Sequence, residues 1–222
     1  KGADRAQCSD VFVANLLKAA AKARAQGVTL LIEPLNTRDF PGYLHSTLDE
    51  GAVMIADSVK YLHGEGRMVL VDLEHFFDGY KDNPEFSLRA LEAAVVNGAS
   101  HLVLCDTNGG TLPSEIGRIV ADVKAHVGND AIIGIHCHDD TGCAVANSMA
   151  AVEAGAGHVQ GTLNGLGERT GNTNLTTVIP NLQLKLGYQC LPEGRIERLT
   201  AVSHHVAETL NRAVNPQAPY VG

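Results

Sequence analysis

The chain has 222 residues, of which 45% are hydrophobic and 19% charged, and it carries a formal net charge of -8. A chain of this length and apolar content can bury a sizeable core, so we expect one structural domain. The acidic balance argues against nucleic acid as a partner, because phosphate binding requires a basic face. No run approaches the roughly 18–20 apolar residues of a membrane span, and no signal-peptide pattern opens the chain. These features predict a cytoplasmic protein without a membrane partner.

Hydrophobic periodicity predicts helices that alternate with strands. The helices are expected at residues 11–26, 48–62, 84–96, 114–127, 144–154, 175–186 and 196–211. The strands are expected at residues 28–32, 68–73, 102–105, 132–138 and 159–163. Such alternation is typical of a parallel sheet covered by helices, and a closed eight-stranded barrel needs about 250 residues. The predicted fold class is therefore α/β, with TIM-barrel-type parallel βα units, an incomplete barrel of about five strands, and C-terminal helices.

The cysteines indicate reduced thiols. Their number is odd, no C-x-x-C spacing occurs, and most of them lie in apolar segments: Cys8, Cys105, Cys137, Cys143 and Cys190. This pattern is typical of buried thiols in a cytosolic protein rather than of a disulfide framework.

The strand that ends in His136-Cys137-His138 carries the strongest functional signal. Side chains alternate along a strand, so the two histidines should share one face, roughly 6–7 Å apart, with Cys137 on the other. A glycine-rich loop, residues 165–172, follows the next strand, so both features should meet at the carboxyl end of the sheet. Two imidazoles so placed can bind one divalent ion. The alternatives are one core and one surface histidine, or Cys137 acting as a thiolate ligand.

Five longer runs point to a family: residues 74–81, 104–113, 134–140, 145–148 and 165–172. From about residue 48 onward the chain resembles the DRE-TIM metallolyase (pyruvate carboxyltransferase-like) superfamily, and within it the citramalate, isopropylmalate and homocitrate synthases. The resemblance implies condensation of acetyl-CoA with a 2-oxo acid, with pyruvate as the expected acceptor and (R)-citramalate as the product. We also expect a homodimer, because an open sheet leaves edge strands to pair.

By this resemblance, His136, His138 and Asn172 would bind the divalent metal, and their mixed N/O ligation suits Zn, Mn, Co or Mg. Asn172 could instead cap the helix that begins at Leu175. Asp106 should face away from the site and is interpreted as structural.

The same resemblance implies roles for three residues near the predicted rim. Glu74 would contact acetyl-CoA, Thr107 would contact the keto acid, and Glu168 would orient a ligand or accept a hydrogen bond from substrate. We therefore interpret Glu74 and Glu168 as catalytic. The alternatives are a solvated strand end for Glu74, a turn hydroxyl for Thr107 and an ion pair with Arg169 for Glu168. The weaker candidates are Asp140, His75 and Asn147.

Residues 2–47 instead resemble hydroxypyruvate isomerases, which are also TIM barrels, on the runs 12–16 and 30–43. This predicts a division into residues 1–47, 48–190 and 191–222. The D-x-T-L-R-D-G strand of the synthases, whose Asp is a metal ligand, is absent, and Glu33 is the candidate carboxylate in its place. The alternative functions are a sugar-acid isomerase of the hydroxypyruvate type and a non-catalytic barrel fragment.

Overall fold

The computed structural model describes residues 4–26, 28 and 48–222. Contacts divide the chain into two compact units, residues 1–57 and 58–222, and the boundary lies inside a helix. Of the predicted strand at residues 28–32, only Val28 is among the described residues. Glu33 also lies outside them. The three-segment division of the chain stays a prediction. Among the described helices, none is long and apolar enough to span a bilayer.

In the first unit, helix α1 (Arg5–Gln26) begins before the predicted residue 11. The Asp4 side chain accepts a hydrogen bond from the Ala6 N–H at 3.2 Å. A carboxylate in this position satisfies one of the N–H groups that a helix start leaves without a partner. This local signal explains the earlier start. Helix α2 (Leu48–Gly64) runs across the boundary between the units.

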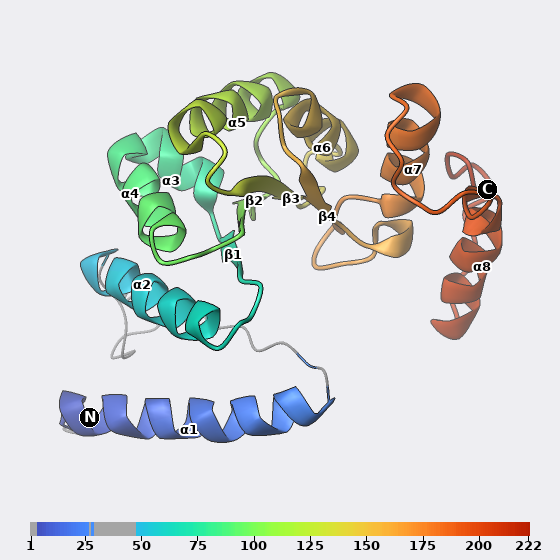
Figure 1. Ribbon diagram of the computed structural model, residues 1–222. Helices are drawn as coiled ribbons and strands as arrows, with labels where there is room; N and C mark the ends of the chain where they lie inside the picture. Colours follow the sequence, from blue (N-terminus) through green and yellow to red (C-terminus); the bar gives the residue numbers. More distant parts are fainter. Residues whose placement is uncertain (1–3, 27, 29–47) are drawn as a thin grey trace. The chain divides into compact units, whose positions relative to one another are not determined.

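The second unit contains a parallel sheet, as predicted. Its strands are β1 (Leu70–Leu73), β2 (His101–Asp106), β3 (Ile132–Cys137) and β4 (His158–Gln160), and each pairs with the next along the chain. Helices cover the outer side of this sheet as an arc (Figure 1): α3 (Phe76–Asp82), α4 (Pro84–Val95), α5 (Pro113–Val127) and α6 (Ala144–Glu153). The described strands form part of a barrel wall.

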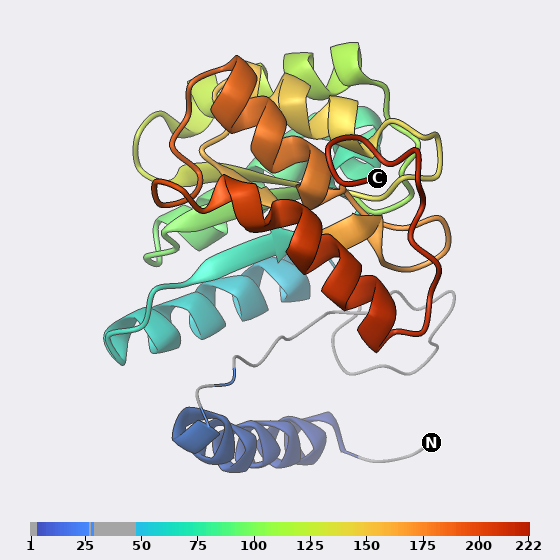
Figure 2. The ribbon, with the colours of Figure 1, turned by 90° about the vertical axis from the view of Figure 1, so that its right-hand side faces the viewer.

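The segment after β4 is helical (Figure 2). It contains η1 (Leu163–Gly165), α7 (Leu175–Pro180), η2 (Asn181–Lys185), η3 (Ile196–Arg198) and α8 (Leu199–Thr209). The sequence predicted one helix over 175–186, but the structure changes from α-helix to a π turn after Pro180. Proline has no N–H to donate to the preceding turn, which explains the change.

The two faces of the sheet differ in chemistry. The register places alternate residues on the outer face, where the α-helices bury them: Leu102, Leu104, Ile133 and Ile135 are all at most 1% exposed. The concave face instead is mixed: its polar side chains are Asp72, His101, His136, His158 and Gln160, and its other residues are Leu70, Val103, Cys105, Ile132 and Gly134. The alternation therefore provides a hydrophobic core on one side and gathers most of the polar side chains of the sheet on the other.

The sheet curves enough for its outermost strands to touch. Asp72 on β1 accepts a hydrogen bond from Gln160 on β4 at 3.0 Å, although two strands lie between them. The rings of His101 and His158 also pack edge to face, 5.3 Å apart. Gly134 lies between these strands, and a Cβ there would approach Val103 Cγ2 to 2.9 Å and His158 Cδ2 to 3.0 Å. The curvature thus requires a residue without a side chain in β3.

Two further elements differ from the sequence prediction. Helix α3 was not predicted, although Phe76, Phe77 and Tyr80 have helical spacing, because Gly79 lowers helix propensity in a segment of only seven residues. Strand β4 ends at Gln160 rather than at residue 163. At Gly161 the chain passes close to the segment after the glycine-rich loop, because a Cβ there would approach Thr173 O to 2.5 Å, and Thr162 N–H donates to the same oxygen at 2.9 Å.

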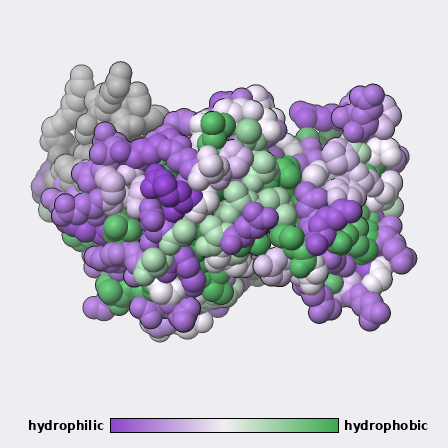
Figure 3. All heavy atoms as spheres, turned by 90° about the horizontal axis from the view of Figure 1, so that it is seen from above, coloured by the Kyte–Doolittle hydropathy of each residue, from purple (hydrophilic) through white to green (hydrophobic). Residues whose placement is uncertain are grey.

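The face of the molecule seen from above mixes hydrophobic and hydrophilic residues (Figure 3). Figure 3 shows hydrophobic and hydrophilic residues in small neighbouring patches on the face seen from above. Single hydrophobic side chains are exposed to solvent at several positions of the described chain, among them Met68, which is 73% exposed, and Val96, which is 78% exposed. Scattered exposure of this kind is ordinary for a folded protein.

Phe77 tests the contribution of α3 to stability. Its side chain is fully buried and packs edge to face with Phe76 at 5.9 Å. Phe77→Ala should lower the free energy of unfolding by about 3–5 kcal/mol, because it removes buried contacts and leaves a cavity. Urea denaturation followed by circular dichroism measures the change. Tyr61→Ala, at a position 51% exposed, is the control and should change stability little.

Candidate functional site

Two histidines and one asparagine converge at the carboxyl end of β3. The ring centroids of His136 and His138 lie 5.3 Å apart. The Asn172 amide Nδ2 is 3.0 Å from His136 Nε2 and 3.5 Å from His138 Nε2. Cys137 is buried on the opposite face, where desolvation raises the pKa of its thiol. The predicted alternation is confirmed, and Cys137 is excluded as a partner of the histidines.

Backbone hydrogen bonds bring Asn172 to this point. Its segment returns past the end of β3 and forms an antiparallel bridge with His138. Asp139 N–H donates to Gly171 O at 3.0 Å, and Thr173 N–H donates to Cys137 O at 2.9 Å. Helix α7 is capped by Asn174, which accepts from Thr176 N–H, so the interpretation of Asn172 as its cap is wrong. The side chain of Asn172 faces the histidines instead.

Two glycines allow this close approach. Gly171 has a φ of 109°, and a Cβ there would overlap with the carbonyl oxygen of Gly165. At Gly167 a Cβ would overlap with Asn172 Oδ1. The loop therefore leaves no room for a side chain beside the Asn172 amide.

The donor chemistry of these three groups fits a divalent cation. His136 Nδ1 lies 2.8 Å from Gln160 Oε1, and its other ring nitrogen, Nε2, faces Asn172. Burial, with smaller contributions from His136 and Arg169, lowers the pKa of His138 and favours its neutral form. A half-turn of the Asn172 amide would present its oxygen in place of Nδ2. Among the described residues, no third His, Cys, Asp or Glu completes a metal-binding group.

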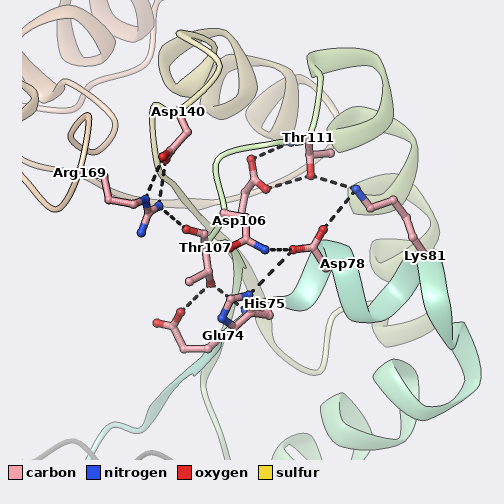
Figure 4. Close-up of polar contacts among 10 residues, drawn as sticks. Glu74, His75, Asp78, Lys81, Asp106, Thr107, Thr111, Asp140 and Arg169 are labelled. Carbon is pink, nitrogen blue, oxygen red and sulfur yellow. Dashed lines mark hydrogen bonds and ion pairs between the residues drawn. The ribbon is translucent and has the colours of Figure 1, made fainter. Parts of the chain in front are cut away.

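Glu74 and Thr107 meet on the same rim (Figure 4). Thr107 Oγ1 donates to Glu74 Oε2 at 2.6 Å and accepts from His75 N–H at 2.8 Å. His75 holds a left-handed backbone conformation with a φ of 55°, which is uncommon outside glycine. The hydroxyl proton of Thr107 is thus used to orient the Glu74 carboxylate.

Arg169 links the glycine-rich loop to the neighbouring rim. It binds Asp140 through two hydrogen bonds of 2.8 and 2.9 Å, and its Nη2 donates to Thr107 O at 2.6 Å. The hydrogen bond from Arg169 lowers the pKa of Asp140 below its ordinary value. Glu168 is 81% exposed and lies 3.9 Å from Arg169 Nη1, with no hydrogen bond to the candidate ligands in the described structure. The expected Arg169–Glu168 pair exists, but Asp140 is the closer partner.

Asp106 and Asn147 support the rim from behind. Asp106 is buried and accepts from Thr111 N–H at 3.2 Å and from its hydroxyl at 2.9 Å, so it faces away from the histidines as predicted. Burial raises the pKa of the Asp106 carboxyl, partly offset by these hydrogen bonds. Asn147 is fully buried and donates to Thr111 O at 2.8 Å. Both residues hold the turn after β2.

The sequence analysis missed two residues of the site, Gln160 and Asp72. The alternation of side chains along the strands could have predicted both of them. Gln160 pairs with His136 in the register of β3 and β4, and Asp72 lies two residues before Glu74. The five cysteines are free, as expected, but only Cys105 and Cys137 are buried: Cys8 and Cys143 are partly exposed, and Cys190 is exposed.

Comparison with known proteins gives relatives over most of the chain. It is 50% identical over 206 residues to an (R)-citramalate synthase of Streptomyces coelicolor, covering 93% of this chain and 38% of that protein. It is 53% identical over 179 residues to an (R)-citramalate synthase of Aquifex aeolicus, covering 81% of this chain and 34% of that protein. The chain therefore spans little more than a third of the length of these relatives.

A solved structure supports the fold. The HMG-CoA lyase of Bacillus subtilis superposes with a TM-score of 0.67 at 21% identity, covering 82% of this chain and 63% of that one. The HMGL-like family profile matches residues 4–206, which includes most of the segment that we assigned to hydroxypyruvate isomerases. That second resemblance is not shown by these matches. The chain belongs to the HMGL-like family.

Proposed function

We propose that this chain carries the catalytic centre of an acyltransferase that condenses acetyl-CoA with pyruvate to (R)-citramalate. The observation that carries the proposal is the meeting of His136, His138 and Asn172 at one point of the rim. The likeness to two (R)-citramalate synthases at 50% and 53% identity supports the choice of reaction. The acceptor, the acetyl donor and the metal are parts of the same proposal.

The two imidazoles and the Asn172 amide would hold a divalent cation such as Zn, Mn, Co or Mg. A cation bound there supplies polarisation of the keto oxygen and neutralises negative charge on the acceptor. Because the chain has a formal net charge of -8, a local positive charge is needed to attract a 2-oxo acid. Arg169 is held by Asp140, so its charge is largely compensated.

Glu74 is the proposed carboxylate on the acetyl-CoA side. Thr107 donates to only one of its oxygens, and an ionised carboxylate offers about four acceptor positions, so capacity remains for substrate. Glu74 would accept a methyl proton from the thioester, and the resulting enolate would attack the keto carbon. The tertiary alkoxide formed would take up a proton, and water would then cleave the thioester to give the carboxylate and free CoA. Glu168, on the exposed loop, is the second proposed carboxylate.

The edges of the described sheet suggest self-association. Strands β1 and β4 each pair on one side only within the described sheet, and unpaired strand edges are frequent sites of association. We therefore also propose that the protein forms a homodimer and that it is located in the cytoplasm. Sedimentation equilibrium should give twice the chain mass, and a monomer at all accessible concentrations would contradict it.

Removing either histidine tests the metal site. His136→Ala and His138→Ala should each weaken Zn²⁺ binding by more than roughly 100-fold, because each removes a direct ligand. Isothermal calorimetry on the metal-free protein measures the affinity. His126→Ala removes a surface histidine that pairs with Glu92 and should leave the affinity unchanged. Equal affinity in all variants would reject the site.

Gly167 tests the position of the Asn172 amide. In Gly167→Ala the added methyl group overlaps with Asn172 Oδ1, so metal affinity should fall by about 10–100-fold. Gly110→Ala is the matched control, because a Cβ at Gly110 meets no atom within 4 Å. Competition with a chromogenic chelator measures both. A loss of affinity in the control as large as in Gly167→Ala would contradict this reading.

The reaction itself is tested by thiol release. Free CoA should appear only when acetyl-CoA, pyruvate and a divalent metal are all present, as measured with a thiol reagent. Glu74→Gln should lower the rate by roughly 10²–10⁴-fold, because it removes the proton acceptor. Glu92→Gln, at an exposed position, is the control. Release that is independent of pyruvate would count against the proposed condensation.

A further inference from the structure

A series of hydrogen bonds crosses the concave face of the sheet and ends on His136. It begins at Asp72 on β1, passes through Gln160 on β4 and reaches His136 on β3. The three residues come from both outermost strands and from the strand beside β4. His136 and Gln160 face each other on paired strands, and the curvature of the sheet brings Asp72 to them.

Each bond in the series has a fixed direction. Gln160 Nε2 donates to Asp72 Oδ1 at 3.0 Å, and an ionised carboxylate can only accept. The amide of Gln160 must therefore turn its oxygen toward His136 Nδ1, 2.8 Å away. Because that oxygen accepts, Nδ1 of His136 carries the proton. The lone pair then lies on Nε2, which faces Asn172 at 3.0 Å.

The neighbouring histidine has no such support. His138 Nδ1 is buried and finds no hydrogen-bond partner among the described residues. Of the two candidate ligands, His136 is therefore the one whose tautomer and ring orientation are set by other side chains. In metal sites, an outer partner of this kind typically raises the basicity of the ligand and fixes its orientation.

We infer that Gln160 and Asp72 are positioning residues for metal binding, which hold His136 as the Nδ1–H tautomer with Nε2 directed at the cation site. The inference rests on the proposed function for its metal, but the tautomer is a property of the chain alone. Asp72 acts through Gln160, since its carboxylate decides which end of the amide meets the imidazole. Neither residue needs to contact substrate.

Gln160→Met is the first test, because methionine has similar length and no acceptor of comparable strength. In the metal-free protein, nitrogen chemical shifts of His136 should show loss of the pure Nδ1–H tautomer. Zn²⁺ affinity measured by calorimetry should fall by about 10–100-fold. An unchanged tautomer in Gln160→Met would overturn the inference.

A reversed pair provides the second test. Gln160→Glu alone places two carboxylates side by side, and their repulsion should move the introduced side chain away from His136 Nδ1 and weaken Zn²⁺ binding. In the double variant Asp72→Asn with Gln160→Glu, the new amide donates and the new carboxylate accepts from His136. The double variant should recover the Nδ1–H tautomer and bind Zn²⁺ more tightly than Gln160→Glu, a coupling that a double-mutant cycle measures. If the losses of Zn²⁺ affinity in the two single variants simply add in the double variant, the proposed series of hydrogen bonds is contradicted.

Ser100→Ala is the matched control. It removes the hydroxyl that lies 2.9 Å from Nδ1 of His101, another histidine of the concave face, and should leave His136 and the metal affinity unchanged. If Ser100→Ala shifts the His136 tautomer as much as Gln160→Met does, the effect is a general disturbance and the inference fails. If the unsubstituted chain binds no metal, the proposed function fails. The nitrogen chemical shifts of His136 then test on their own whether Gln160 and Asp72 set its tautomer.

Discussion

Side-chain alternation along parallel strands is the constraint on which the rest of this structure depends. Each strand delivers every second residue to the helices and the others to the concave face. On the central strands β2 and β3 the outer set is apolar and buried, Asp106 at the end of β2 excepted, which stabilises the sheet through removal of hydrocarbon from water. The inner set is then free to be polar. A one-residue shift of β3 would exchange His136 with Cys137 and would remove both the core contact and the candidate site.

The loop after β4 depends on backbone rather than on side chains. Its last residues run beside the end of β3 and exchange main-chain hydrogen bonds with it, which places Asn172 against the histidines. The glycines at 167 and 171 permit that approach, because a side chain at either would overlap with the loop itself. Arg169 then ties the loop to Asp140 and to the carbonyl of Thr107. The candidate metal ligand Asn172, the glycine-rich loop and the neighbouring rim are therefore joined by hydrogen bonds into one arrangement.

Much of the site follows from local patterns. The H-x-H at the end of an apolar run predicted two imidazoles on one face, and the structure confirms it. Asn172 required the family resemblance, because the sequence alone favoured a helix cap, and Asn174 takes that role. Helix α3 was not predicted, because a seven-residue helix that contains glycine has a weak periodic pattern of hydrophobic residues. The Arg169–Asp140 pair joins residues of two loops, and no spacing rule connects them.

The sequence by itself determined the order of the elements, the parallel sheet and the pairing of His136 with His138 on one face, because periodicity of two or 3.6 residues is a local property of the backbone. Only the tertiary structure decided that Asp72 would reach Gln160, that Thr107 would orient Glu74, and that Asn172 would lie between two imidazoles. These contacts depend on the curvature of the sheet and on the path of one loop. Both arise from packing across residues far apart in the chain, which no local pattern records.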